Sequence, residues 1–213
     1  MKKIIVTLCV IILVISAAGC ESITPNPTEP ATEVYSTVAA PTEATQSATL
    51  IESTNIYDIY KIGFNYNYRI FNKKGDIKLE RENETRCPYF TMLTDSLLEV
   101  KCQTGTGQST NWAYYYDYEK DIISETYSYV LSSTNTLVAH INLNINGKPI
   151  LIIQSIFPTG SYYLEISEFE KPLSTPCTDP IQYVTFCNDS KSIEVVYLSG
   201  EDYKKATQTF DLY

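Results

Sequence analysis

The sequence predicts an all-β protein, built as an antiparallel meander of about 10–13 short strands. Apolar and polar residues alternate in one run after another, turn residues separate the runs, and no convincing amphipathic helix interrupts them. The 18 tyrosines suit this class, because aromatic side chains fit a pleated, half-buried surface.

The clearest strand pattern is FNYNYRI, residues 64–70, in which Phe64, Tyr66, Tyr68 and Ile70 share one face. Further strands are predicted at 96–102, 111–117, 137–145, 150–157, 162–169, 181–187 and 193–198. ILIIQSIF, residues 150–157, is apolar on both faces, which favours a strand covered on two sides. Asn146-Gly147, between two apolar runs, predicts a hairpin turn.

The ends of some predicted strands recur at similar spacings. Such strands end at Phe71, Tyr116, Phe157 and Leu198, and these positions follow one another at nearly equal intervals. Repeats of this length with several strands per unit are typical of propeller blades, so blade-like repeats of about 41 residues are one hypothesis. The alternative is a β-sandwich, whose short strands can give the same spacing by chance.

The N-terminus has the layout of a secretory signal peptide: Lys2 and Lys3, an apolar run, then small residues. The apolar run of about 12 residues is shorter than a membrane-spanning helix requires. Its ending, Ala17-Ala18-Gly19-Cys20, resembles the lipobox of bacterial lipoproteins, although that family prefers Leu where Ala17 stands. The resemblance covers residues 1–20 only.

The lipobox resemblance implies a location. It implies cleavage between Gly19 and Cys20, a diacylglyceryl lipid on Cys20, and anchoring at the extracytoplasmic face of the cell membrane. Residues 1–19 are then the signal peptide. Residues 20–55, rich in Thr, Pro, Ala and Glu and free of Lys and Arg, are predicted to be a disordered tether. Residues 56–213 are predicted to form one extracytoplasmic β-domain.

The charge of the chain argues against nucleic acid as a partner. The formal net charge is −9 and no cluster of Lys and Arg is present, whereas phosphate binding needs such clusters. No cofactor is expected apart from the covalent lipid. A metal site is not expected either, because no Cys-x-x-Cys occurs, and Asp117, Glu119 and Asp121 lack the glycine that a calcium loop requires.

Four cysteines lie in the predicted domain: Cys87, Cys102, Cys177 and Cys187. An even number outside the cytoplasm favours disulfides, and the pairs Cys87–Cys102 and Cys177–Cys187 are preferred because each flanks a short connection. Buried free thiols are the alternative.

The aromatic stretch WAYYYDY places Trp112, Tyr114, Tyr116 and Tyr118 on one face of a strand. Such a row can stack on sugar rings or grip a peptide, and it can equally be sheet packing. His140, the one histidine, is predicted to lie on a polar strand face, and no nucleophile or orienting partner at a recognisable spacing accompanies it.

These observations favour a non-catalytic binding or interaction module on a membrane anchor, with a wall glycan or an exported protein as the candidate partner. Two alternatives stay open. One is a surface glycan hydrolase that uses paired carboxylates. The other is an inhibitor lipoprotein that acts on hydrolases.

Overall fold

A computed structural model describes residues 47–175 and 177–213. In this part of the chain, 16 strands form four antiparallel sheets, and the 3₁₀ turn η1 (Gln108–Thr110) is the one helical element. The all-β prediction is therefore confirmed, and the strands outnumber the 10–13 predicted. No helix among the described residues is long and apolar enough to span a membrane. The predicted signal peptide, Gly19 and Cys20 lie outside the described residues.

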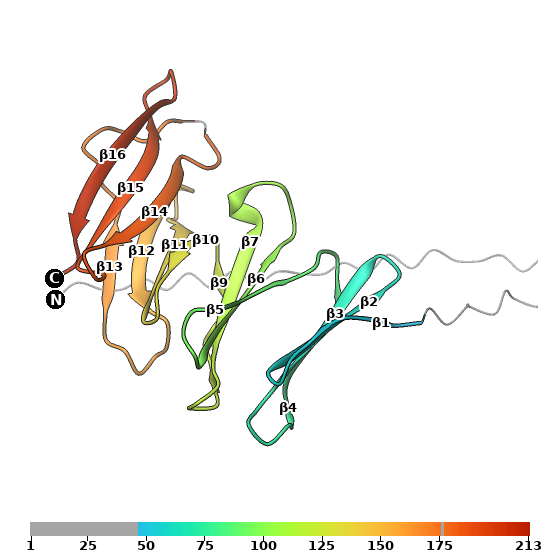
Figure 1. Ribbon diagram of the computed structural model, residues 1–213. Coiled ribbons are helices and arrows are strands. Elements are labelled where there is room, and N and C mark those ends of the chain that lie inside the picture. Colours follow the sequence, from blue (N-terminus) through green and yellow to red (C-terminus); the bar gives the residue numbers. More distant parts are fainter. Residues whose placement is uncertain (1–46, 176) are drawn as a thin grey trace, which may run out of the picture. The chain divides into compact units, whose positions relative to one another are not determined.

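Each sheet consists of strands that follow one another in the chain (Figure 1). The first sheet contains β1 (Thr49–Ser53), β2 (Tyr57–Ile62), β3 (Asn65–Phe71) and β4 (Ile77–Glu84). The second contains β5 (Tyr89–Met92), β6 (Leu97–Gln103), β7 (Asn111–Asp117) and β8 (Ile122–Ile123), with β9 (Tyr127–Ser128) also paired to β7. The third contains β10 (Val130–Ser133), β11 (Leu137–Leu143), β12 (Pro149–Ser155) and β13 (Tyr163–Ile166). The fourth contains β14 (Ile181–Cys187), β15 (Ser192–Ser199) and β16 (Lys204–Asp211).

The predicted boundary between tether and domain needs a correction. Residues 49–53 fall within the predicted tether, but they form β1 and pair with β2. All five residues of β1 are exposed, because it is an edge strand without a buried face. The segment therefore lacks the alternation of apolar and polar positions by which a half-buried strand is recognised.

Three hydrophobic clusters hold neighbouring sheets together. Between the first and second sheets, Tyr68 and Ile70 of β3 share a cluster with Tyr114 and Tyr116 of β7. A second cluster joins the second and third sheets, and the third joins the third and fourth. Successive side chains of a strand point to opposite faces. A strand such as β7 can therefore contribute to two clusters, and Tyr115 belongs to the second of them. The arrangement is sheet-on-sheet packing, and none of the four sheets closes on itself.

The first three sheets share one turn, which joins their first and second strands. Thr54, Thr94 and Thr134 recur at equal intervals along the chain. Each accepts hydrogen bonds on Oγ1 from the backbone N–H groups two and three positions later, at 3.0–3.2 Å. In each turn an Asn or Asp follows the threonine. This Thr-Asn/Asp pair was a repeat signal that strand ends alone did not reveal.

The spacing of strand ends was partly misleading. Phe71 and Tyr116 lie in third strands and Phe157 lies two residues after one, but Leu198 lies in β15, the second strand of the fourth sheet. The interval from Phe157 to Leu198 therefore does not separate equivalent strands.

Candidate binding site

A cavity of about 370 Å³ lies where the second sheet meets β10 of the third. Seven residues line it: Tyr89, Lys101, Gln103, Gln108, Asn111, Val130 and Leu131. Strand alternation on β6 explains its polarity. Leu98 and Val100 belong to the cluster with the first sheet, so Lys101 and Gln103 point to the opposite face. The cavity wall thus combines an ammonium group, three amide side chains and a phenol.

Lys101 is a half-buried cation without a carboxylate partner in the described part of the chain. Its Nζ donates one hydrogen bond, to the carbonyl oxygen of Val130 at 3.3 Å. Glu99 lies two residues earlier, but its Oε1 accepts the hydroxyls of Tyr115 at 3.2 Å and Ser133 at 2.7 Å. An ammonium group has three donors, so Lys101 can offer further hydrogen bonds to an anion in the cavity.

Two amide side chains that line the cavity also join the elements around it. Asn111 Oδ1 accepts the backbone N–H of Val130 at 2.7 Å and so joins β7 to β10. Gln108 Nε2 donates to the carbonyl oxygen of Gln182 at 3.0 Å, which connects η1 to β14. Gln108 Oε1 is buried and has no hydrogen-bond partner in the part of the chain that the structure describes. An unpaired buried carbonyl is costly, so this oxygen is an acceptor that a ligand or water donor would stabilise.

Tyr129, the residue before β10, has a backbone that bulky side chains rarely adopt. Its φ is 54°, in the left-handed region. Its hydroxyl donates to Asp179 Oδ1 at 2.8 Å, and its N–H donates to the carbonyl oxygen of Asn111 at 2.8 Å. Burial, followed by the contact with Asp179, raises the pKa of Tyr129. Backbone strain of this kind gathers near functional sites, and here it lies beside the cavity.

The predicted aromatic row is not an exposed surface. Tyr114 and Tyr116 are 1% and 0% exposed and pack between the first and second sheets. Trp112 and Tyr118 are partly buried against the same cluster. Because the first sheet covers this face of β7, the four rings follow the sheet-packing alternative and do not form an exposed stacking platform.

The four domain cysteines are free thiols, so the two predicted disulfides are not present. Cys187 on β14 pairs with Ser192 on β15. Cys177 belongs to a different place: its N–H donates to the carbonyl oxygen of Ser174, whose own N–H donates to the carbonyl oxygen of Leu198. Ser192 and Leu198 lie near opposite ends of β15, separated by about 20 Å of strand, which is far beyond the roughly 7 Å limit between the Cα atoms of a disulfide.

The other predicted pair, Cys87 and Cys102, is also unbonded. Cys102 is buried in β6, and Cys87, two residues before β5, packs against the cluster between the first and second sheets. Burial raises the pKa of Cys102 to about 12 and also raises the pKa of Cys87. Both thiols are therefore poor nucleophiles at neutral pH.

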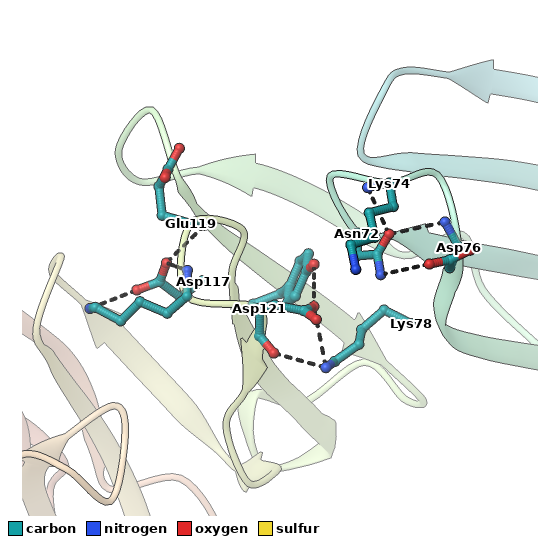
Figure 2. Close-up of polar contacts among 9 residues, drawn as sticks. Asn72, Lys74, Asp76, Lys78, Asp117, Glu119 and Asp121 are labelled. Carbon is teal, nitrogen blue, oxygen red and sulfur yellow. Dashed lines mark hydrogen bonds and ion pairs between the residues drawn. The ribbon is translucent and has the colours of Figure 1, made fainter.

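In the acidic turn after β7, the carboxylate of Asp117 is engaged by groups of the turn itself, as Figure 2 shows. Asp117 Oδ1 accepts the N–H groups of Glu119 and Lys120 at 3.1 and 3.0 Å, and Oδ2 lies 2.8 Å from Lys120 Nζ. Burial alone would raise the pKa of Asp117, but the hydrogen bonds and charge of Lys120 outweigh it and lower that pKa.

The same turn also reaches the first sheet. Asp121 accepts the hydroxyl of Tyr116 at 2.9 Å and lies 3.2 Å from Lys78 Nζ (Figure 2). Lys73 forms an ion pair with Glu119. No group of three His, Cys, Asp or Glu side chains placed to hold a metal occurs within the described ranges. The turn bridges two sheets through ion pairs.

His140 lies between sheets and not on a solvated polar face, which corrects the prediction. Its ring centroid is 5.3 Å from that of Tyr127, and its Nε2 is buried with no hydrogen-bond partner among the described residues. Burial lowers the pKa of His140 to about 4, so the ring is neutral at pH 7.

Fold and site together define a class: an all-β protein of four stacked antiparallel sheets with a polar cavity between two of them. No family model matches the sequence, and no curated protein matches it.

Proposed function

We propose that this protein is a lipid-anchored binding module at the extracytoplasmic face of the cell membrane, and that the Lys101 cavity holds its ligand. The observation that carries the binding role is one cavity lined by Lys101, whose ammonium has no carboxylate partner among the described residues, and by Gln108, whose buried Oε1 has no hydrogen-bond partner there. The lipobox-like ending at Cys20 supports the anchor. The residues that line the cavity contain no carboxylate, which favours binding over acid–base hydrolysis there.

The residues that line the cavity indicate which chemical groups a ligand would carry. Lys101 fits a carboxylate, and Gln103, Gln108 and Asn111 fit hydroxyl or amide groups. Tyr89 and Leu131 offer apolar surface on which the face of a sugar ring can pack. A cavity of about 370 Å³ is at the small end for ligand sites, so we propose one acidic sugar unit of a wall glycan as its occupant.

We propose further that the sheets are blade-like repeats. Support comes from the three Thr-Asn/Asp turns, which are evenly spaced in the sequence, and from the packing of each sheet on the next in chain order. Repeat proteins of this kind stack units that contact only their neighbours. A binding cavity between two units fits this arrangement.

One observation favours the hydrolase alternative. A second hollow of about 370 Å³ lies at the ends of β13 and β16 and is lined by Glu165, Glu168 and Asp211 together with apolar residues. If this hollow cleaved glycans, Glu165→Gln or Asp211→Asn would abolish release of reducing sugar from a wall preparation. Wild-type protein without such release would exclude this alternative.

The binding proposal is tested by calorimetric titration of the full-length protein in detergent. The probes are glucuronate, glucose and inorganic phosphate. We expect glucuronate to bind, glucose to bind more weakly, and Lys101→Met to weaken glucuronate binding at least tenfold while its circular dichroism stays unchanged.

Lys148→Met is the matched control, because Lys148 is an exposed lysine in the β11–β12 turn. It should bind like wild type. Equal binding of glucuronate by Lys101→Met and wild type would contradict the site. Equal binding of glucose and glucuronate would contradict the acidic ligand.

A further inference from the structure

We infer that the outer edge of β16 pairs antiparallel with β16 of a second copy of this chain. The first and third sheets each have four strands in line, whereas the fourth has three and ends at β16. Within the residues that the structure describes, no strand pairs with the outer edge of β16. This inference is independent of the cavity and its ligand.

The edge of β16 is long and regular. Its eight residues pair with β15 in an unbroken register from Ser192↔Asp211 to Ser199↔Lys204. Its middle, Ala206–Phe210, carries no charge. Proteins usually protect such edges with bulges, charges or short strands, because an open ladder of N–H and C=O groups recruits another strand.

The other eight-residue edge strand shows that protection. β4, at the edge of the first sheet, has two register irregularities against β3 and carries charges throughout its length. Asn83 in β4 also has a φ of 62°, which breaks the regular strand conformation. β16 has charged residues only at its ends, so it is the edge best suited to accept a strand.

Two-fold symmetry limits the possible registers. Residues directly opposite each other in an antiparallel pair lie on the same face. Two identical strands must therefore pair about a central residue that faces its own copy. A pairing centred on Gln208 sets Thr207 opposite Thr209 of the other copy, Ala206 opposite Phe210, and Lys205 opposite Asp211.

This register matches both charge and size. Lys205 and Asp211 are exposed, carry opposite charges and meet twice in the dimer. Ala206 is buried and small, and it faces the large, half-buried Phe210 on the side that packs in the sheet-to-sheet core. A pairing centred on Thr207 would instead place Lys204 opposite Phe210. The Gln208-centred pairing would join two three-stranded sheets into one of six strands.

Charge reversal tests the interface by light scattering coupled to size-exclusion chromatography of the full chain in detergent. We expect a dimer for wild type and a monomer for Lys205→Asp and for Asp211→Lys, because each variant sets like charges opposite each other. The double variant Lys205→Asp/Asp211→Lys should restore the dimer. Lys148→Asp, at a distant exposed turn, should remain dimeric.

A cysteine scan tests the register. Under oxidation, Gln208→Cys should crosslink the two copies, and Thr207→Cys should not, since the two Thr207 Cα atoms would be about 8 Å apart. Wild-type protein treated alike gives the background from native thiols. A monomeric wild type would overturn the pairing. Crosslinking through Thr207→Cys alone, or a dimer unaffected by either charge reversal, would overturn the register.

Discussion

The hydroxyl of Tyr114 on β7 donates a hydrogen bond to the hydroxyl of Tyr68 on β3 at 3.1 Å, across the interface of the first and second sheets. Both side chains are almost fully buried, at 1% and 0% exposure. Burial raises the pKa of both tyrosines, so both hydroxyls are protonated at neutral pH. Two polar groups thus satisfy each other inside an otherwise apolar cluster.

Removing both hydroxyls of this pair should cost less than the sum of removing each one alone. Tyr114→Phe leaves the Tyr68 hydroxyl buried without its partner, and we expect a loss of about 1–3 kcal/mol in the free energy of unfolding. The double variant Tyr68→Phe/Tyr114→Phe should lose less than the sum of the single variants. Urea unfolding followed by tryptophan fluorescence measures all three, and Tyr163→Phe, at an exposed tyrosine, is the control. Additive losses would show that the hydroxyls do not depend on each other.

The stability of the protein should fall in mild acid because of His140. Its pKa is about 4 in the folded state and 6.5 ordinarily, so the unfolded state binds the extra proton between these values. The stability that the neutral His140 contributes to the folded state is fully present above pH 6.5 and is lost as the pH falls toward 4. By linkage the loss is about 2 kcal/mol at pH 5 relative to pH 7.

His140→Leu isolates this effect, because leucine does not titrate. The difference in unfolding free energy between wild type and variant should shift by about 2 kcal/mol between pH 7 and pH 5, with wild type losing more. Carboxylate titration is common to both proteins and cancels in the difference. A difference that does not change with pH would show that His140 is accessible to protons in the folded state.

The β14–β15 turn should be stabilised by glycine. Asn188, Asp189 and Ser190 all have positive φ, at 50°, 52° and 65°. Asn and Asp tolerate this conformation better than other residues with a side chain, so Ser190 carries most strain. Ser190→Gly should raise the melting temperature and add about 0.5–1 kcal/mol of stability.

Thr185→Gly is the control for that substitution. Thr185 is an exposed residue of β14 and has no positive φ, so glycine there should destabilise the protein by increasing the freedom of the unfolded chain. Destabilisation by both variants would contradict the strain assigned to Ser190.

The membrane anchor is tested at Cys20. Intact-mass analysis of the membrane fraction should show a chain that starts at Cys20 and carries a diacylglyceryl group. Cys20→Ala should lose the added mass and the cleavage before residue 20. Cys9→Ala, within the apolar run, should behave as wild type. An unlipidated protein released into the medium in both cases would contradict the lipoprotein proposal.

Two strands match their predicted ranges from end to end, β7 at 111–117 and β14 at 181–187. β1 was missed because all of its side chains are exposed. The predicted strand at 162–169 ends earlier, at Ile166, since the following residues leave the sheet.

The cavity could not be predicted from sequence because its walls come from separate elements. Lys101 and Gln103 alternate with apolar residues on β6 and so resemble any solvated strand face. Only the packing of β10 beside this face brings Val130 to the lysine and completes the cavity. Gln108 could not be recognised as a cavity residue from sequence, because its amide is held by the carbonyl oxygen of Gln182, which is far away in the sequence.

Local sequence was enough to predict the β class, about half of the strands, several turns and a signal-like N-terminus, because these depend on periodicity and on residue chemistry within a few positions. Tertiary packing settled which faces are covered. It turned the aromatic row of β7 into core and, within residues 47–175 and 177–213, left the cysteines unbonded and Lys101 without a carboxylate partner. These outcomes depend on how sheets distant in sequence pack together, which no local pattern encodes.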